Sequence, residues 1–298
     1  SAGSALTDGP GNVLLGRSAG AAMTTSDYNV AIGFQALDAL TTNSHNNIAI
    51  GKNALGVQAA DQTGGSITDG SVNSIAIGKN ALGAQNNADA INLAIGWDAG
   101  DAITTGTRNV LIGHETGSAL AGNNDCTAVG YNALNVATGA DNTAIGRATA
   151  VQLLGGTKNT VMGSAAMYDA GDDSDGSESY NTAIGHAALY ALDVNDGEYN
   201  TALGSNAHGS AATAVENETS IGYNATGQGT NTVTIGNADV TDIYAAQDSG
   251  ATIHCGGIIE VGGVLKENLL TNSGFDVWSN ATSEVVSTPY SDTDGSSH

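Results

Sequence analysis

Thirteen short apolar segments recur along the chain, each closed by a glycine and followed by a polar stretch. In the copy Asn-Val-Ala-Ile-Gly, residues 29–33, side chains alternate as in a β-strand, so Val30 and Ile32 share one face and Ala31 points to the other. The glycine supplies the backbone freedom for a sharp turn. Each copy therefore predicts one short strand and one turn. The closing glycines are Gly16, Gly33, Gly51, Gly78, Gly96, Gly113, Gly130, Gly146, Gly163, Gly185, Gly204, Gly222 and Gly236.

Most of these glycines are 16 to 19 residues apart, and longer gaps of 27 and 22 residues mark two insertions. A fixed short period is typical of a solenoid, in which each repeat forms one coil and identical slots stack above one another. We expect an all-β, parallel β-solenoid of about 13 coils over residues 10–236. Stretches such as AALYAL look locally helical, but a glycine in every repeat disfavours a helical repeat.

Two further slots are expected to stabilise the stack. The residue before the glycine is always a large aliphatic or Met, and we expect this column to fill a narrow interior. Asparagine stands four residues before the glycine in nine copies and can form an amide ladder along the axis. The structural residues singled out are Ile32, Ile50, Ile77 and Ile95, Asn29, Asn47, Asn92 and Asn142, and the glycines Gly33, Gly51, Gly78, Gly96, Gly113, Gly146 and Gly185.

A column of alanines two residues before the glycine suggests an assembly. If the isoleucines fill the coil, the alanines face outward. A solvent-exposed strand face would normally carry polar side chains instead. Two apolar faces on a thin coil imply a second buried surface, so we expect sister chains to cover the alanines in a homotrimer. The alternative is a monomer with an exposed alanine stripe. The predicted trimer interface is Ala31, Ala49, Ala76, Ala94, Ala144 and Ala183.

The run NVAIGFQALDAL, with NIAIGKNAL and NTAIGHAAL, resembles the head repeats of YadA-like trimeric adhesins, whose signature is Asn-Ser-Val-Ala-Ile-Gly. It is also similar to repeats in bacteriophage tail fibres. The resemblance covers residues 10–236 and implies a left-handed parallel β-roll, three chains side by side, and attachment to a host or cell surface from an extracellular position on a virion tail fibre or a cell appendage. The slightly longer period and the lack of the adhesin's stalk and anchor favour the phage-like version.

The composition of the chain restricts the classes of binding partner that we expect. With 7 Lys and Arg against 30 Asp and Glu, the formal charge of -23 disfavours nucleic acid and anionic membranes. No apolar run reaches the length of a membrane span, so we expect no membrane insertion. Cys126 and Cys255 lie about seven coils apart, too far for a disulfide. The histidines are scattered and no catalytic or cofactor motif is recognised, so we expect neither an enzyme nor a bound cofactor.

The insertions are candidate binding loops, because solenoid insertions become surface loops. The second insertion carries Asp172, Asp173, Asp175 and Glu178, oxygen ligands that suit calcium, although it does not match the calcium-loop template. We expect a receptor, in particular a glycan, to bind here, with Tyr168, Tyr180 and Tyr199 as candidate contact aromatics.

The two ends differ from the repeats. Residues 1–9 form a lead-in, and residues 237–265 are expected to be cap or neck strands that protect the end of the solenoid. Residues 266–298 are a tail or the start of a further module. Within this stretch, NLLTNSGFDVWSN resembles the opening strand of carbohydrate-binding jelly-roll modules.

The function expected is that of a non-enzymatic trimeric attachment fibre. The alternatives are a purely architectural spacer, a bacterial adhesin head, and an ice-binding solenoid. The last is suggested by a threonine column in the slot three residues before the glycine: Thr127, Thr143, Thr160, Thr182, Thr201 and Thr219.

Overall fold

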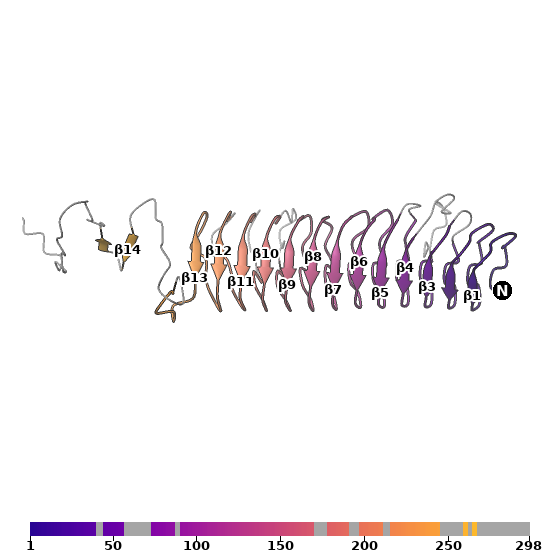
Figure 1. Ribbon diagram of the computed structural model, residues 1–298, viewed down its shortest axis with the longest axis horizontal. Coiled ribbons are helices and arrows are strands. Elements are labelled where there is room, and N and C mark those ends of the chain that lie inside the picture. Colours follow the sequence, from indigo (N-terminus) through magenta and orange to yellow (C-terminus); the bar gives the residue numbers. More distant parts are fainter. Residues whose placement is uncertain are drawn as a thin grey trace, which may run out of the picture. The chain divides into compact units, whose positions relative to one another are not determined.

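The computed structural model describes residues 1–39, 44–56, 73–86, 90–169, 178–190, 197–210 and 215–244, together with the backbones of strands at 259–261 and 264–266. The chain divides into two compact units, Ser1–Thr241 and Asp242–His298. The first unit is a parallel β-solenoid in which thirteen strands form one sheet in the order of the sequence (Figure 1). Every regular element of the described residues is a β-strand. Those residues include no helix long and apolar enough to cross a lipid bilayer.

Each strand of the sheet is three residues long and ends on the residue before a closing glycine. The strands are β1 (Val13–Leu15), β2 (Val30–Ile32), β3 (Ile48–Ile50), β4 (Ile75–Ile77), β5 (Leu93–Ile95), β6 (Val110–Ile112), β7 (Thr127–Val129), β8 (Thr143–Ile145), β9 (Thr160–Met162), β10 (Thr182–Ile184), β11 (Thr201–Leu203), β12 (Thr219–Ile221) and β13 (Val233–Ile235). In the second unit, β14 (Ile259–Val261) pairs antiparallel with β15 (Val264–Lys266).

Neighbouring strands pair slot for slot, which confirms the repeat that the glycine spacing predicts. Ala31 of β2 lies opposite Ala49 of β3, with the flanking aliphatic residues equally in register. The longer gap before β4 does not disturb this pairing, because Ala49 lies opposite Ala76. The parallel register therefore continues across the longer gap.

The closing glycines are required both by conformation and by space. Gly33 has φ +139° and Gly51 has φ +136°, a region that residues with a Cβ rarely adopt. A Cβ on Gly33 would lie 2.4 Å from the carbonyl oxygen of Gly51 in the next coil. The glycine column therefore lets adjacent turns approach to hydrogen-bonding distance, as the repeat predicts.

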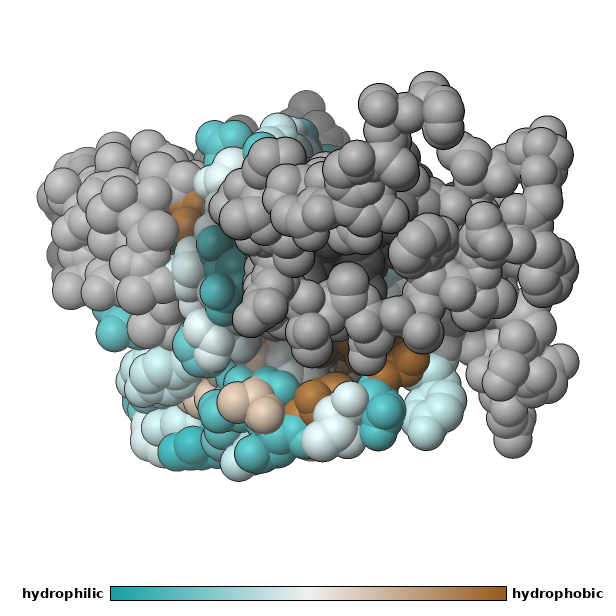
Figure 2. All heavy atoms as spheres, turned by 90° about the vertical axis from the view of Figure 1, so that its left-hand side faces the viewer, coloured by the Kyte–Doolittle hydropathy of each residue, from teal (hydrophilic) through white to brown (hydrophobic). Residues whose placement is uncertain are grey.

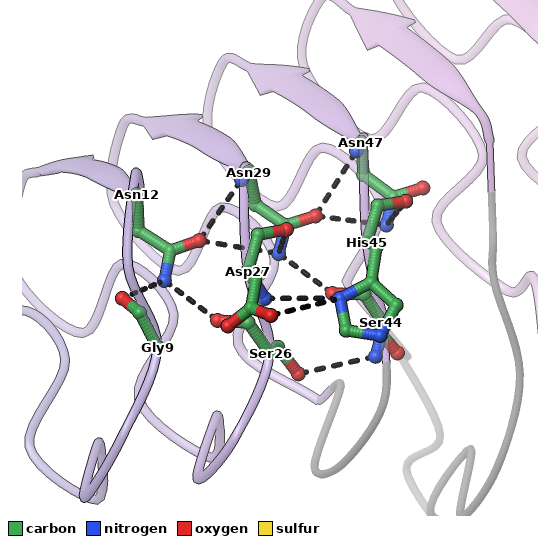
Figure 3. A network of polar contacts seen from close by, with 8 residues as sticks. All are labelled: Gly9, Asn12, Ser26, Asp27, Asn29, Ser44, His45 and Asn47. Atoms are coloured by element: carbon green, nitrogen blue, oxygen red, sulfur yellow. Dashed lines mark hydrogen bonds and ion pairs between the residues drawn. The ribbon is translucent and has the colours of Figure 1, made fainter.

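The asparagine column forms the expected ladder (Figure 3). The backbone N–H of Asn29 donates to Oδ1 of Asn12 at 2.9 Å, and the N–H of Asn47 donates to Oδ1 of Asn29 at 3.0 Å. The Asn29 side chain also donates through Nδ2 to the carbonyl of Ser44 at 2.7 Å. Each amide thus satisfies a buried N–H of the next coil and holds the returning loop of that coil.

The predicted orientation of the strands is wrong. The alanines Ala31, Ala49, Ala76, Ala94, Ala144 and Ala183 are fully buried within the single chain, and the isoleucines before the glycines are on the outward face. The alanines therefore cannot be covered by sister chains. The physical reason is that the coil is thin, so only a small side chain fits where the strand faces the opposite wall. Leucines such as Leu37 and Leu82, four residues after a glycine, fill the rest of the interior.

Interior volume is compensated within and between coils. Leu111 of β6 takes the slot that is usually alanine, and the coils of β5 and β6 carry Gly100 and Gly117 at the position that Leu37 and Leu82 occupy elsewhere. A Cβ on Gly100 would lie 2.7 Å from Cδ1 of Leu111, and one on Gly117 would lie 2.9 Å from Cδ2. The core is packed so closely that a larger residue in one slot requires smaller ones beside it.

Candidate functional site

The outward face of the thirteen-stranded sheet is the candidate functional site. Side chains of the first and last residue of each strand point outward, and together they form what we call the aliphatic stripe, in which the first position is threonine from β7 to β12. The stripe comprises Val13, Leu15, Val30, Ile32, Ile48, Ile50, Ile75, Ile77, Leu93, Ile95, Val110, Ile112, Thr127, Val129, Thr143, Ile145, Thr160, Met162, Thr182, Ile184, Thr201, Leu203, Thr219, Ile221, Val233 and Ile235.

The stripe is only partly covered by its own chain. Leu15 at one end is 64% exposed and Val233 at the other is 66% exposed, and most residues between them are half-buried. Figure 2 views the molecule from the β13 side and shows hydrophobic residues beside hydrophilic ones on the described surface. Parallel sheets normally have both faces covered, and a long exposed apolar surface indicates an interaction site. The stripe is therefore a candidate interaction surface.

Aromatic and basic side chains border the stripe on one side. The residue directly after each closing glycine forms what we call the trailing ladder. Its members contact one another from coil to coil: the Arg17 guanidinium lies 4.4 Å from the Phe34 ring centroid, Lys79 Nζ lies 4.7 Å from that of Trp97, and the His114 and Tyr131 rings stack at 5.4 Å. The ladder is Arg17, Phe34, Lys52, Lys79, Trp97, His114, Tyr131, Arg147, Ser164, His186, Ser205, Tyr223 and Asn237.

A second border, the leading ladder, is formed by the residue two positions before each strand. Arg108 makes a bidentate ion pair with Asp125, with Nε and Nη2 each 2.7 Å from a carboxylate oxygen, and this contact lowers the pKa of Asp125. Lys158 donates to the hydroxyl of Tyr180, whose ring stacks on Tyr199 at 5.0 Å. The ladder is Gly11, Tyr28, Asn46, Asn73, Ile91, Arg108, Asp125, Asp141, Lys158, Tyr180, Tyr199, Asn217 and Asn231.

The two ladders contain every Lys and Arg of the solenoid unit. Six of the seven basic residues of the chain lie in them, and the seventh is Lys266. The trailing ladder carries no acidic residue, although the chain has 30. Such segregation places the basic side chains beside the aliphatic stripe. Sequence reasoning missed these ladders, although the residue after each repeat glycine was visible as R, F, K, K, W, H, Y and R in successive copies.

The structure separates the three tyrosines proposed as receptor contacts. Tyr180 and Tyr199 stack on each other in the leading ladder, whereas Tyr168 stacks on Tyr190 at 5.5 Å with the ring planes 7° apart. Tyr168 and Tyr190 each lie five residues after a closing glycine and thus outside both ladders. The solenoid therefore presents two distinct tyrosine pairs.

The predicted metal site falls mostly outside the described residues. Asp172, Asp173 and Asp175 lie there, and only Glu178 of the four candidates is described. The Glu178 side chain is buried, and its backbone carbonyl accepts a hydrogen bond from Nδ2 of Asn159. The described part of the chain holds no cluster of three or more residues suited to a metal ion. Calcium at the acidic insertion stays a prediction.

Cys126 occupies an asparagine slot and is fully buried. The backbone N–H of Cys126 donates to Oδ1 of Asn109, so the asparagine ladder of the preceding coils extends to the backbone of Cys126. Burial raises the pKa of the thiol to about 11, which keeps it protonated and unreactive. The interpretation of Cys126 as a small buried side chain agrees with this environment.

Comparisons with protein-family models, with curated proteins and with solved structures found no match.

Proposed function

We propose that three chains associate side by side through their aliphatic stripes into a stiff fibre segment that attaches a virion or a cell to a surface and performs no catalysis. In this arrangement each chain is a left-handed β-roll, and the outward face of its sheet is directed towards the common axis. The proposal replaces the alanine column with the aliphatic stripe as the contact surface.

The aliphatic stripe is the observation that carries the proposal. A stable monomer would be expected to place polar residues on the outward face of its sheet, as antiparallel sheets with one wet face do. Here that face carries Val, Ile or Leu at both positions of the first six strands. Association of three chains would remove this surface from water at about 25 cal/mol per Å² of apolar area.

A rod of this kind suits projection from a surface. Thirteen strands at about 4.8 Å spacing span roughly 60 Å, and each coil is held to the next by the sheet, the glycine turns and the asparagine ladder. Three copies of every outward loop would act together on a receptor, which raises avidity without new contacts. Light scattering on the full chain tests the assembly. A three-chain mass supports it, and a single-chain mass at all concentrations refutes it.

The receptor class we propose is a glycan, bound by the Tyr168 and Tyr190 pair and by the acidic insertion that follows Tyr168 in the sequence. Aromatic rings offer the apolar faces that sugars pack against, and Tyr190 is 44% exposed. A glycan array with the intact protein tests this. Binding that disappears in a Tyr168→Ala, Tyr190→Ala variant but persists in a Tyr180→Ala, Tyr199→Ala variant supports the proposal.

Loss of residues 170–174, which reduces the spacing between Gly163 and Gly185 from 22 to the usual 17 residues, separates the insertion from the tyrosines. Unchanged glycan binding without this segment excludes the insertion as part of the site. If the intact rod binds neither glycans nor cells, the architectural alternative is favoured, in which the fibre only spaces a distal receptor-binding tip.

Ice binding is a second candidate, because the threonine column is on the outward face from β7 to β12. Threonines at strand spacing beside aliphatic residues form a flat, regular surface. The same surface cannot bind ice while sister chains cover it, so the two functions exclude each other. Thermal hysteresis by a single-chain form would support ice binding, and a trimer without hysteresis would exclude it.

A further inference from the structure

The aliphatic stripe explains association but does not define axial alignment, and this inference rests on the proposed trimer. The outward pair of residues is nearly constant from β1 to β6 and again from β7 to β12, so sliding one chain by one coil, about 4.8 Å, costs only the contact of one terminal coil and the match at the change from aliphatic residues to threonine. Staggered chains would still bury almost the whole stripe. An aperiodic feature is therefore needed to align the coils.

The two ladders are the aperiodic part of the outward face. Along the leading ladder the side chains change from aromatic to amide, aliphatic, basic and acidic, and the trailing ladder changes equally from coil to coil. In a closed three-fold ring of parallel rods, one edge of each sheet lies beside the opposite edge of the next sheet. The leading ladder of one chain then faces the trailing ladder of its neighbour.

When the coils of two adjacent chains lie at the same height along the axis, the side chains that face each other across this contact are complementary. In the coil of β8, Asp141 is in the leading ladder and Arg147 is in the trailing ladder. The coil of β5 offers Ile91 opposite Trp97, both more than half exposed. Aligned coils therefore match an acid with a base and an aliphatic with an aromatic side chain.

Within the described part of the chain, Asp141 and Arg147 take part in no ion pair. The Arg147 guanidinium lies 6.0 Å from the centroid of the Tyr131 ring, a contact that leaves its charge uncompensated. Asp141 lies near enough to Arg108 and Lys158 to contribute to the raised pKa of each, but among the described residues its carboxylate makes no hydrogen bond to either side chain, so Asp141 and Arg147 can pair with a neighbouring chain.

A shift of one coil in either direction loses these matches. In one direction Lys158 meets Arg147, a like-charge contact, and Ile91 meets Lys79. In the other direction Asp141 meets Ser164 and Ile91 meets His114.

The second shift also brings Asp125 opposite Arg147, but the carboxylate of Asp125 is already held by Arg108 through two hydrogen bonds. The aligned register is therefore the one in which both unpaired charges are matched.

We propose that Asp141 of one chain pairs with Arg147 of the next and that this contact, repeated three times around the axis, fixes the chains in register. Charge complementarity at an interface contributes to alignment more than to raw affinity, because misaligned like charges are penalised.

Charge exchange tests the pair. Asp141→Arg brings two arginines together at each contact and Arg147→Asp brings two aspartates together, so each should raise the dissociation constant of the trimer about tenfold or more. The combined variant restores opposite charges and should return to within about threefold of the wild type. The leading-ladder slot tolerates arginine, because Arg108 occupies it with φ +60°, close to the φ +61° of Asp141.

Asp8→Arg is the matched control, since Asp8 is an exposed acid outside both ladders and the change of charge is the same. Its trimer should dissociate like the wild type. Light scattering over a dilution series measures all four variants, with circular dichroism to confirm folding. If the wild type is a trimer but both single variants are equally tight, or if the combined variant is no tighter than the single ones, the pair is refuted. A monomeric wild type instead refutes the assembly itself.

Discussion

At the scale of single residues, the fold depends on positions where only one side chain fits. The closing glycines from Gly16 to Gly204 combine positive φ with a carbonyl oxygen of the next coil within 2.6 Å of where a Cβ would lie, so neither requirement can be relaxed alone. The repeat glycine is therefore the most informative single letter of this sequence. Its spacing predicts thirteen short strands in parallel register, and the strand pairing confirms them.

Gly51→Ala tests this requirement. Its Cβ would lie 2.4 Å from the carbonyl oxygen of Gly78, so we expect a loss of about 3 kcal/mol or more in unfolding free energy. Gly229→Ala is the control, because Gly229 also has positive φ but a Cβ there would meet no atom within 4 Å beyond its chain neighbours. It should cost only about 1 kcal/mol. Thermal unfolding followed by circular dichroism compares them, and equal losses would contradict the role of close approach.

At the scale of structural elements, the asparagine ladder connects each strand to the next loop. The Cys126 thiol donates only a weak hydrogen bond to the returning loop, with Sγ 3.5 Å from the carbonyl of Gly139, where the neighbouring coils use a side-chain amide. Cys126→Asn should supply this donor and raise the unfolding free energy by about 1 kcal/mol. Asn142→Ala is the opposite change and should lower it by about 2 kcal/mol, because it leaves the N–H of Asn159 buried without its acceptor. Chemical denaturation measures both, and a destabilised Cys126→Asn variant would contradict the ladder account.

The Cys126 thiol also predicts a pH dependence. Its pKa is raised to about 11 in the folded chain, so above about pH 9 the unfolded chain releases a proton that the folded chain retains. The thiol contribution to stability is therefore full below pH 8 and falls as the pH rises towards 11, by up to about 3 kcal/mol. The melting temperature of Cys126→Asn should exceed that of the wild type by more at pH 10 than at pH 7. A constant difference would contradict burial of the thiol.

Interior packing couples neighbouring slots. Leu111→Ala should cost about 3 kcal/mol through the cavity it leaves. Gly117→Ala should cost about 2 kcal/mol, because its Cβ would lie 2.9 Å from Leu120 Cδ1 and equally close to Leu111 Cδ2. In the combined variant the contact with Leu111 no longer exists, so the loss should be smaller than the sum. Denaturation of all three variants gives the coupling, and strictly additive losses would contradict it.

At the scale of the whole molecule, the sequence predicts the stack but not which face of each strand is inside. Both faces are apolar, so alternation alone does not tell inside from outside, and side-chain size is a misleading guide in so thin a coil. A better signal is how few residue types a slot accepts. The buried slot holds alanine in most strands, and leucine stands there only where glycines such as Gly100 and Gly117 make room, whereas the stripe exchanges Val, Ile, Leu, Thr and Met freely.

The ladders and any assembly lie beyond what spacing can predict. Contacts between side chains of successive coils, such as Lys79 over Trp97, depend on which slots face outward, and alternation does not identify those slots. With the alanines inside and the larger aliphatic residues outside, the aliphatic stripe is the surface on which the proposed fibre depends, and the two ladders border it.

The central claim is that the aliphatic stripe is the contact between chains, and the mass of an Ile112→Asp variant in solution tests it most directly. Ile112 is half-buried in the middle of the stripe, and three aspartates at the axis would repel one another. Val136→Asp is the control, since Val136 is an exposed aliphatic residue outside the stripe. We predict a three-chain mass by light scattering for the wild type and for Val136→Asp, and a folded single chain for Ile112→Asp. A single-chain wild type, or an Ile112→Asp variant that keeps the three-chain mass, would contradict the account.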